Sequence, residues 1–365
     1  MVARSAAHRP RKVAPVTLTF GIFDHIEDIP GTPTHQLFRD RLELAKLADE
    51  AGFTSFHLAE HHGSALCMSP TQEIFVAAAS QVTTNLRLGP MVKLLPLHHP
   101  VQILEDMCAA DQLTGGRLDF GVGRGVSPIE HAWFGSKWTE SRERFEDTLG
   151  IICHAFASGE ISSAGSVYHD FPTVPLSTKP LQDPIPFWYP GNPVVAGRHG
   201  MSLMCAGAVP QSTRDAYLES WETHRADTLR LDGPQSEPRI GLTLILAIAP
   251  SEKEALEISR RGVDGLVRRT KAIHSYDHLV LSPADCARAL KPLEAILSHI
   301  EATVTAGAGV PEQIGERLSA VLETGLVDHI SLQVPTGDMT YAEARRTVEL
   351  FASEVKPELE RRFAA

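Results

Sequence analysis

Cysteine is scarce in this 365-residue sequence, and the five cysteines lie far apart. No two of them form a CxxC pair. A sparse and odd-numbered set excludes a disulfide framework and a structural zinc site built on cysteine pairs. This usage is typical of a reducing compartment, so we expect a cytoplasmic protein. The five residues are Cys67, Cys108, Cys153, Cys205 and Cys286.

Basic charge and long apolar runs are lacking as well. The chain has 34 Lys and Arg against 45 Asp and Glu, which gives a net charge of −11, and its pI is about 5.9. Nucleic-acid binding needs a basic face, so this class is excluded. No apolar run approaches the roughly 20 residues that span a bilayer, and no membrane association is expected. Residues 1–15 are basic and lack the apolar stretch of a signal peptide, so we expect a disordered tail there.

What the sequence does contain is the material for a large core, arranged as alternating strands and helices. Hydrophobic residues make up 43% and charged residues 22%, the balance of an ordinary globular protein. From residue 17 onward, short β-favouring runs alternate with segments whose apolar residues share one helical face. This alternation implies right-handed crossovers and a parallel sheet. The predicted strands cover residues 17–23, 53–58, 86–95, 117–122, 185–189, 203–206, 240–249 and 329–334.

A count of about eight strands favours an α/β fold of the (β/α)8 TIM-barrel type over an open doubly wound sheet. Such a barrel needs about 250 residues, so roughly a hundred remain for tails and insertions. We expect one barrel domain over residues 16–365, with insertions near 158–186 and 268–309 at its C-terminal face. The predicted helices cover residues 36–51, 72–82, 102–113, 142–156, 194–199, 213–231, 251–267, 311–324 and 341–363.

Polar and glycine-rich clusters follow four of the predicted strands. The C-terminal ends of barrel strands lie on one rim, so we expect these clusters to converge there. Imidazoles beside a carboxylate and an arginine suit proton transfer and anion binding. The clusters are Glu60-His61-His62, the segment 94–101 with His98-His99, Gly123-Arg124-Gly125, and Pro190-Gly191-Asn192-Pro193.

A metal site is the competing interpretation of the first cluster. Adjacent residues on an extended segment point to opposite faces, so His61 and His62 cannot readily share one ion. The sequence also lacks the HExxH pattern of a zinc-binding helix. We therefore expect no metal.

The glycine-rich cluster does not fit a dinucleotide-binding fingerprint, because that motif leads directly into a helix, whereas Val126-Ser127-Pro128 follows here. Two other interpretations remain. Gly123 and Gly125 would allow the backbone to approach a flat ligand, with Arg124 as a planar charged donor. Alternatively, the glycines form a tight turn and Arg124 a surface ion pair. Asn192 followed by proline is typical of a helix start, whose free N–H groups attract anions.

In combination, these motifs resemble those of the bacterial luciferase-like flavin-dependent monooxygenases. The likeness covers nearly the whole chain from Thr17 onward, and the run from Leu94 to Gly135 is its specific part. The matching segments are residues 51–53, 60–62, 95–101, 105–106, 111–118, 121–125, 133–135, 309–314, 328–330 and 351–355.

The resemblance implies a homodimeric (β/α)8 barrel that binds reduced FMN supplied by a separate flavin reductase. In that family the flavin reacts with O2 to a C4a-peroxide, which then oxygenates a small organic substrate. By resemblance, His61 manages protons around this intermediate, and Glu60 and His99 are its catalytic neighbours.

The same resemblance assigns the flavin contacts. Met91-Val92 falls where the family has a non-proline cis peptide against the flavin ring. Arg124, followed by Gly125, falls on the arginine that binds the flavin phosphate, and Gly191-Asn192 falls on the phosphate loop. Gly123 stands where luciferase has a reactive cysteine, which argues against light emission.

Three other functions share parts of this pattern. A deazaflavin-dependent oxidoreductase has the same barrel and phosphate site, and a luciferase-like partner subunit keeps the barrel without turnover. A metal-dependent barrel hydrolase is the third. The paired histidines and the arginine favour the FMN monooxygenase, whose organic substrate the sequence leaves open.

Overall fold

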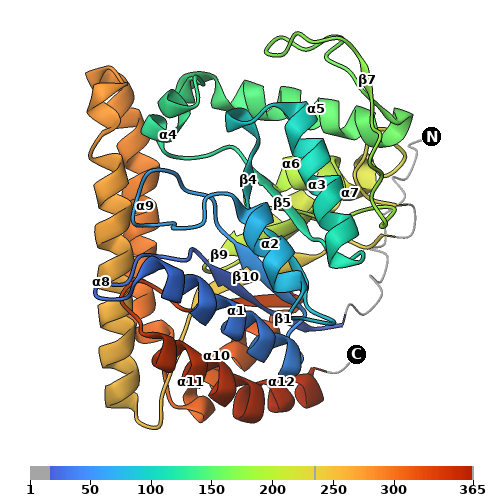
Figure 1. The fold of residues 1–365 in the computed structure, drawn as a ribbon. Helices are drawn as coiled ribbons and strands as arrows, with labels where there is room; N and C mark the ends of the chain where they lie inside the picture. The colour runs from blue at the N-terminus through green and yellow to red at the C-terminus, as the bar shows by residue number, and fades with distance from the viewer. Residues whose placement is uncertain (1–16, 234–235, 364–365) are drawn as a thin grey trace, which may run out of the picture.

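A parallel β-barrel surrounded by helices forms the centre of the computed structural model (Figure 1). The structure describes residues 17–233 and 236–363, so the tail expected at residues 1–15 lies outside the described residues. The barrel strands are β1 (Thr19–Asp24), β2 (Ser55–Leu58), β3 (Arg87–Pro90), β4 (Lys93–Leu94), β5 (Phe120–Gly123), β8 (Phe187–Tyr189), β9 (Ser202–Ala206), β10 (Ile240–Ile245) and β13 (His329–Gln333).

These strands are neighbours in the order β3-β2-β1-β13-β10-β9-β8-β5-β4, and all their pairings are parallel. β3 and β4 are successive parts of one strand, since β3 pairs with β2 and β4 pairs with β5. A bridge between Leu88 and Leu118 crosses the same seam. The nine segments of the described sheet therefore form a barrel of eight strands, and the predicted (β/α)8 fold is confirmed.

Helices surround the barrel, and local chemistry sets their ends. α3 begins at Pro100, where a proline fits because the first helical N–H has no partner within the helix. It ends at Gly115, whose φ of 67° is the left-handed conformation of a helix C-cap. The surrounding helices are α1 (Thr34–Glu50), α2 (Gln72–Ser80), α3 (Pro100–Thr114), α5 (Ser141–Ser158), α6 (Pro193–Arg198), α7 (Gln211–Thr223), α10 (Pro311–Leu322), α11 (Tyr341–Leu350) and α12 (Lys356–Arg362).

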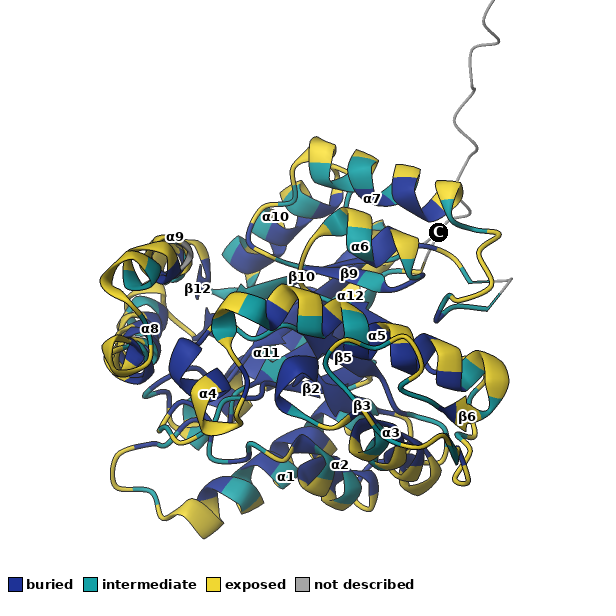
Figure 2. Ribbon diagram, turned by 90° about the horizontal axis from the view of Figure 1, so that it is seen from above, coloured by how far each residue is buried: buried dark blue, intermediate teal, exposed yellow. Residues whose placement is uncertain are grey.

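The core extends from the barrel interior to the inner faces of these helices. All residues of β2, β5 and β13 are buried, as expected for parallel strands covered on both sides. In Figure 2 the buried residues fill the barrel, whereas the exposed ones lie on the outward faces of the helices. None of the helices in the described ranges has both the length and the apolar character that crossing a membrane requires.

The two segments predicted as insertions contain secondary structure of their own. Residues 158–186 include a small antiparallel ribbon of β6 (Glu160–Ile161) and β7 (Val174–Pro175). Residues 268–309 belong to a hairpin of two long helices, α8 (Glu252–His274) and α9 (Pro283–Ala306), which Figure 2 shows end-on beside the barrel. The helix predicted to stop at residue 267 therefore continues to His274, and α9 and the short α4 (Pro128–Trp133) were not predicted.

Gly89 of β3 lies where a neighbouring backbone comes closest. A Cβ at this position would be 1.6 Å from the carbonyl oxygen of Asp119, across the seam of the barrel. The Gly89→Ala substitution is expected to lower the free energy of unfolding by about 2 kcal/mol or more, because one backbone must move. Urea denaturation measures this change.

Gly150→Ala in α5 is the matched control, since a Cβ there meets nothing within 4 Å. It is expected to leave stability unchanged or to raise it by up to about 1 kcal/mol, the helix propensity of alanine over glycine. Equal stabilities of the two variants would contradict the close packing at Gly89.

Candidate active site

A cavity of about 380 Å³ opens at the C-terminal ends of the barrel strands. Its wall is built from residues that follow β1, β2, β5 and β8 and from the break between β3 and β4. The convergence of the polar clusters on one rim is therefore confirmed. Eight of the predicted site residues line this cavity: Glu60, His61, Met91, Val92, Arg124, Gly125, Gly191 and Asn192.

One side of the cavity is cationic, because Arg124 and Arg142 both line it. The Arg124 guanidinium donates a hydrogen bond to the Ser141 hydroxyl at 2.9 Å. Neither arginine forms an ion pair with a carboxylate within the described ranges. Burial and the positive charge of Arg142 lower the pKa of Arg124. Glu146 of α5 also lines this cavity, but it is not an ion-pair partner of either arginine. Two arginines that share a space and lack an ion-pair partner suit a bound anion such as a phosphate.

The loop after β8 lies beside these arginines. The Asn192 side chain accepts a hydrogen bond from the backbone N–H of Val194 at 2.8 Å and caps α6, so the predicted helix start is present. A Cβ at Gly191 would lie 2.3 Å from the Tyr189 ring, so only glycine lets the loop pass this close to the aromatic side chain.

Backbone comes close to the cavity on either side of Arg124 and at the break between β3 and β4. Gly125 has a φ of 80°, a conformation that favours glycine. A Cβ at Gly123 would lie 2.2 Å from a methyl carbon of Val92. The Met91-Val92 peptide bond, which also lines the cavity, is cis. These positions leave space for a flat ring against backbone.

His61 is held by a buried carboxylate. Its Nδ1 lies 3.3 Å from Oε1 of Glu130, and the same oxygen accepts the backbone N–H of His62 at 2.6 Å. Burial opposes the charged form of the imidazole, but the neighbouring carboxylates, Glu130 foremost, outweigh it and raise the pKa of His61. The His61 imidazole on the cavity wall therefore favours its protonated form more than a free histidine does.

Glu60 is a fixed carboxylate. Its Oε1 accepts from Nε2 of His62 at 2.8 Å and from Nε2 of His98 at 2.5 Å, and its Oε2 accepts from the Leu94 backbone at 2.8 Å. Burial opposes the charge, yet the two histidine hydrogen bonds lower the pKa of Glu60 to about 2. The Glu60 side chain therefore links the loop after β2 to Leu94 and His98, which lie in the segment after β3.

The expectation that His99 neighbours His61 and Glu60 is corrected by the structure, which places His98 there. His99 is exposed, accepts the Val101 N–H at 3.3 Å as the cap of α3, and packs against Phe171 with ring centroids 4.9 Å apart. The physical reason is that the backbone at His98 is extended, so consecutive side chains point to opposite sides.

Glu60, His62 and His98 are also the residues that could hold a metal ion, since their ligand atoms all lie within 4.8 Å of one another. Their oxygen–nitrogen separations of 2.8 and 2.5 Å are hydrogen-bond distances. Ligand atoms bound at about 2 Å to one small ion lie roughly 3 Å apart. The arrangement thus suits shared protons, and the expected absence of a metal stays a prediction.

A second cavity, of about 500 Å³, lies between the barrel mouth and the α8–α9 hairpin. It adjoins the first along a common wall formed by Phe23, His25, His61 and Val126. A polar space with a cationic end thus lies beside an apolar one. The apolar residues that line the second cavity include Leu66, Ile245, Leu266, Ile273, Leu293, Ile296 and Ile300.

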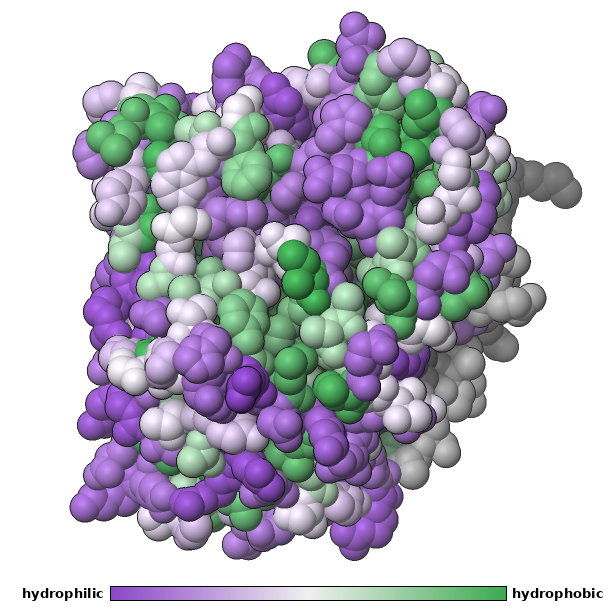
Figure 3. All heavy atoms as spheres, in the orientation of Figure 1, coloured by the Kyte–Doolittle hydropathy of each residue, from purple (hydrophilic) through white to green (hydrophobic). Residues whose placement is uncertain are grey.

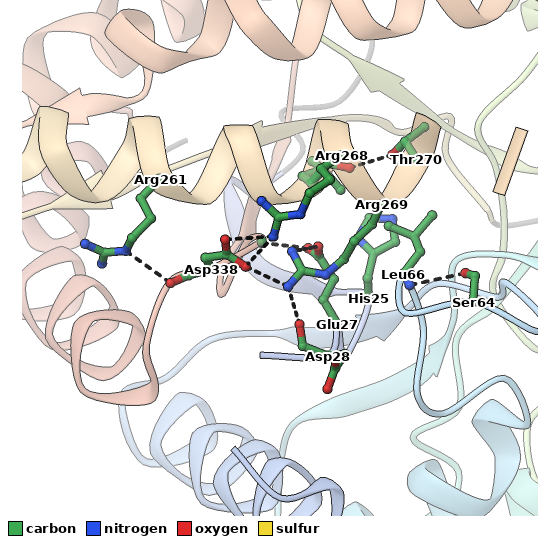
Figure 4. A network of polar contacts seen from close by, with 12 residues as sticks. His25, Glu27, Asp28, Ser64, Leu66, Arg261, Arg268, Arg269, Thr270 and Asp338 are labelled. Atoms are coloured by element: carbon green, nitrogen blue, oxygen red, sulfur yellow. Dashed lines mark hydrogen bonds and ion pairs between the residues drawn. The ribbon is translucent and has the colours of Figure 1, made fainter. Parts of the chain in front are cut away.

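Polar contacts attach α8 to two loops at the barrel mouth (Figure 4). The buried Arg269 guanidinium lies 2.6 Å from Asp338 and 3.4 Å from Glu27, and it donates to the carbonyl oxygen of Asp28. Glu27 also accepts the backbone N–H of Gly337 at 2.7 Å, and burial raises the pKa of this carboxyl group to about 7. The network holds the hairpin against the loops that follow β1 and β13.

The tip of the hairpin rests on α4. Asp277 contacts Nδ1 of His274 at 2.8 Å and accepts the backbone N–H of Ile129 at 3.4 Å. The hairpin is thus attached along α8, through Arg269, and at its tip, through Asp277.

Sequence reasoning missed three residues of the site: His25, Glu130 and Arg142. His25 follows the end of β1 directly, the position after a strand at which the four predicted clusters also lie, but it is a lone polar residue and not part of a cluster. Glu130 lies on α4, which is too short to show the periodic apolar pattern of a helix. Arg142 has the sequence context of an ordinary exposed residue on a long helix.

Residues 18–329 match the family of luciferase-like monooxygenases. The chain belongs to this family, which confirms the resemblance of its motifs, and it is an oxidoreductase of the flavin-dependent monooxygenase class. The 4-hydroxyprotoasukamycin monooxygenase of Streptomyces nodosus subsp. asukaensis is 27% identical over 93% of this chain and 92% of its own.

Two solved structures share the fold. The monooxygenase RslO1 from Streptomyces bottropensis has a TM-score of 0.76 at 23% identity, over 93% of this chain and 99% of its own. The oxygenating constituent of 3,6-diketocamphane monooxygenase from Pseudomonas putida, solved in complex with FMN, has a TM-score of 0.67 at 19% identity, over 94% of this chain and 98% of its own.

The Glu130→Gln substitution is expected to lower the pKa of His61, because a neutral amide no longer favours the imidazolium. A pH titration of the ¹⁵N-labelled histidine rings by NMR measures it, with the His61 signal identified by its loss in His61→Ala. Glu312→Gln, which neutralises an exposed carboxylate of α10, should leave the titration unchanged. An unaltered His61 pKa in E130Q would contradict the assigned pairing.

Proposed function

We propose that this protein uses reduced FMN and O2 to oxygenate a small organic substrate. The observation that carries the proposal is the pair of adjoining cavities with His61 on their common wall. One cavity has a cationic end and close backbone, and the other is mainly apolar. A flavin in the first and a substrate in the second would both reach the imidazole.

The residues of the first cavity fit the cofactor. Arg124 and Arg142 lack a carboxylate partner in the described part of the chain and would bind the phosphate together with the Gly191-Asn192 loop. Met91, Val92 and Gly125 would lie against the ring, where side chains leave room for it. Bound reduced FMN supplies the electrons with which O2 is activated.

His61 then handles the proton. Its raised pKa keeps the imidazole protonated to higher pH than a free histidine, and Glu130 holds Nδ1. Nε2 is the nitrogen left to give a proton to a bound oxygen atom and to take one back. Glu60 acts as a positioning residue, because its two histidine contacts fix the loop that carries His61.

The hairpin of α8 and α9 excludes water from the second cavity. Its apolar residues form one wall, and the contacts of Arg269 and Asp277 hold it over the barrel mouth. A dry site matters here because water diverts activated oxygen from the substrate.

A flavin reductase and a second copy of the chain are the proposed partners. The oxygenase component of the flavin-dependent trigonelline monooxygenase of Acinetobacter baylyi is 24% identical over 65% of this chain, and this relative supports a separate supply of reduced flavin. Apolar side chains gather near the centre of the face in Figure 3, where Figure 1 shows α2, and Ile74 of α2 is 71% exposed. This surface supports the homodimer. The cytoplasmic location stays a prediction.

Arg124→Ala is expected to weaken the binding of reduced FMN by about ten- to a hundredfold, the range for a lost charge-assisted hydrogen bond. Reduced riboflavin, which lacks the phosphate, should bind the variant as it binds the wild type. Anaerobic absorbance titrations measure both affinities.

Arg260→Ala, which removes an exposed arginine of α8, serves as the control and should bind both flavins normally. An unchanged FMN affinity in R124A would remove Arg124 from the phosphate site. Tighter binding of a reduced deazaflavin than of reduced FMN by the wild type would favour the deazaflavin alternative.

His61→Ala is expected to bind reduced FMN and consume O2 but to release hydrogen peroxide instead of oxygenated product. The comparison uses a compound that the wild type oxygenates and measures product and peroxide per flavin oxidised. His154→Ala, an exposed position on α5, should keep the wild-type ratio. Full yield of product by H61A would contradict the role of His61.

A further inference from the structure

In the described part of the chain, the second cavity offers a ligand no Lys, Arg or carboxylate partner, and the charge of His61 on its wall is already paired with Glu130. Its lining contains no Lys, Arg, Asp or Glu among the described residues. A carboxylate or an ammonium group placed there would lose its hydration without a compensating ion pair. The ligand of this cavity is therefore uncharged, and its polar contacts must be hydrogen bonds to neutral side chains.

His25 is the neutral polar residue on the wall between the two cavities. Only four of the described residues line both, and of these only His25 and His61 are polar. The two imidazoles are stacked, with ring centroids 5.8 Å apart and planes at 15°. Burial, together with the neighbouring His61 charge, lowers the pKa of His25 to about 3.

The contact with Gln333 fixes which ring nitrogen of His25 carries the proton. The side-chain amide nitrogen of Gln333 lies 3.4 Å from Nδ1 of His25. An amide nitrogen can only donate, so Nδ1 is the acceptor and Nε2 carries the hydrogen. His25 thus offers one N–H donor at the boundary between the flavin cavity and the apolar cavity.

We propose that the Nε2–H of His25 binds an oxygen acceptor, a carbonyl oxygen foremost, of an uncharged and otherwise apolar substrate. This inference rests on the proposed function and adds a substrate class to it: neutral ketones or related oxygen-bearing molecules of mainly hydrocarbon character. The donor would hold the oxygen-bearing carbon at the wall that the two cavities share. The hydrocarbon part of the molecule would fill the space beneath α8 and α9.

Binding of paired probes to the protein loaded with oxidised FMN tests this inference. The probes are cyclohexanone and cyclooctanone, each paired with the cycloalkane of the same ring size. Their affinities are read from the perturbation of the flavin absorbance or by calorimetry. Two variants are compared with the wild type: His25→Leu, which keeps bulk without a donor, and His25→Gln, which keeps an N–H donor.

His25→Leu is expected to weaken the binding of at least one ketone by about three- to tenfold, the range for a lost neutral hydrogen bond, and to leave the matching cycloalkane unaffected or bound more tightly. His25→Gln should retain the ketone affinity more closely than His25→Leu. Because His25 also lines the flavin cavity, the FMN affinity of each protein is measured first and the probes are compared at saturating FMN.

The outcomes separate this inference from the proposed function. Failure of the wild type to bind FMN would overturn the proposed function and this inference with it. Normal FMN binding would leave the proposed function standing. In that case, equal losses for ketone and cycloalkane in H25L, or no ketone binding by the wild type, would overturn the assignment of His25.

Discussion

The buried carboxylate of Glu130 is the contact on which the site depends most. A single oxygen, Oε1, accepts the N–H of His62 and faces the ring of His61, so it sets both the loop after β2 and the charge of the imidazole. Glu130 lies on α4, and the neighbouring Ile129 N–H donates to Asp277 at the tip of the hairpin. His61 and the α8–α9 hairpin are therefore both held by the same short helix.

The two buried carboxylates of the site, Glu60 and Glu130, differ in their surroundings. Glu60 is surrounded by N–H donors and stays charged, whereas Glu130 lies against an imidazole that holds a proton. Burial, together with the neighbouring His61 charge, lowers the pKa of the adjacent His25 to about 3. The cationic end at Arg124 lies on a different loop, after β5, so the proposed anion site and His61 occupy separate parts of one rim.

Much of this arrangement could be predicted from the sequence, because strand periodicity and the residues after each strand identify a barrel and its rim. The choice between His98 and His99 could not, since the short turn at Leu95–Leu97 decides which ring faces Glu60. The length of α8 was missed for a similar reason. Arg268 and Arg269 read as a polar helix end, yet Arg269 is buried against carboxylates that come from distant loops. Long-range charge pairs of this kind leave no local pattern.

The account assigns the flavin to the cationic cavity and the substrate to the apolar one. A crystal structure of the protein with FMN tests this division most directly. The account predicts the phosphate between Arg124, Arg142 and the Gly191-Asn192 loop, the ring against Met91 and Val92, and the cavity beneath α8 and α9 left open. A phosphate bound elsewhere, or a flavin ring that fills the apolar cavity, would contradict it.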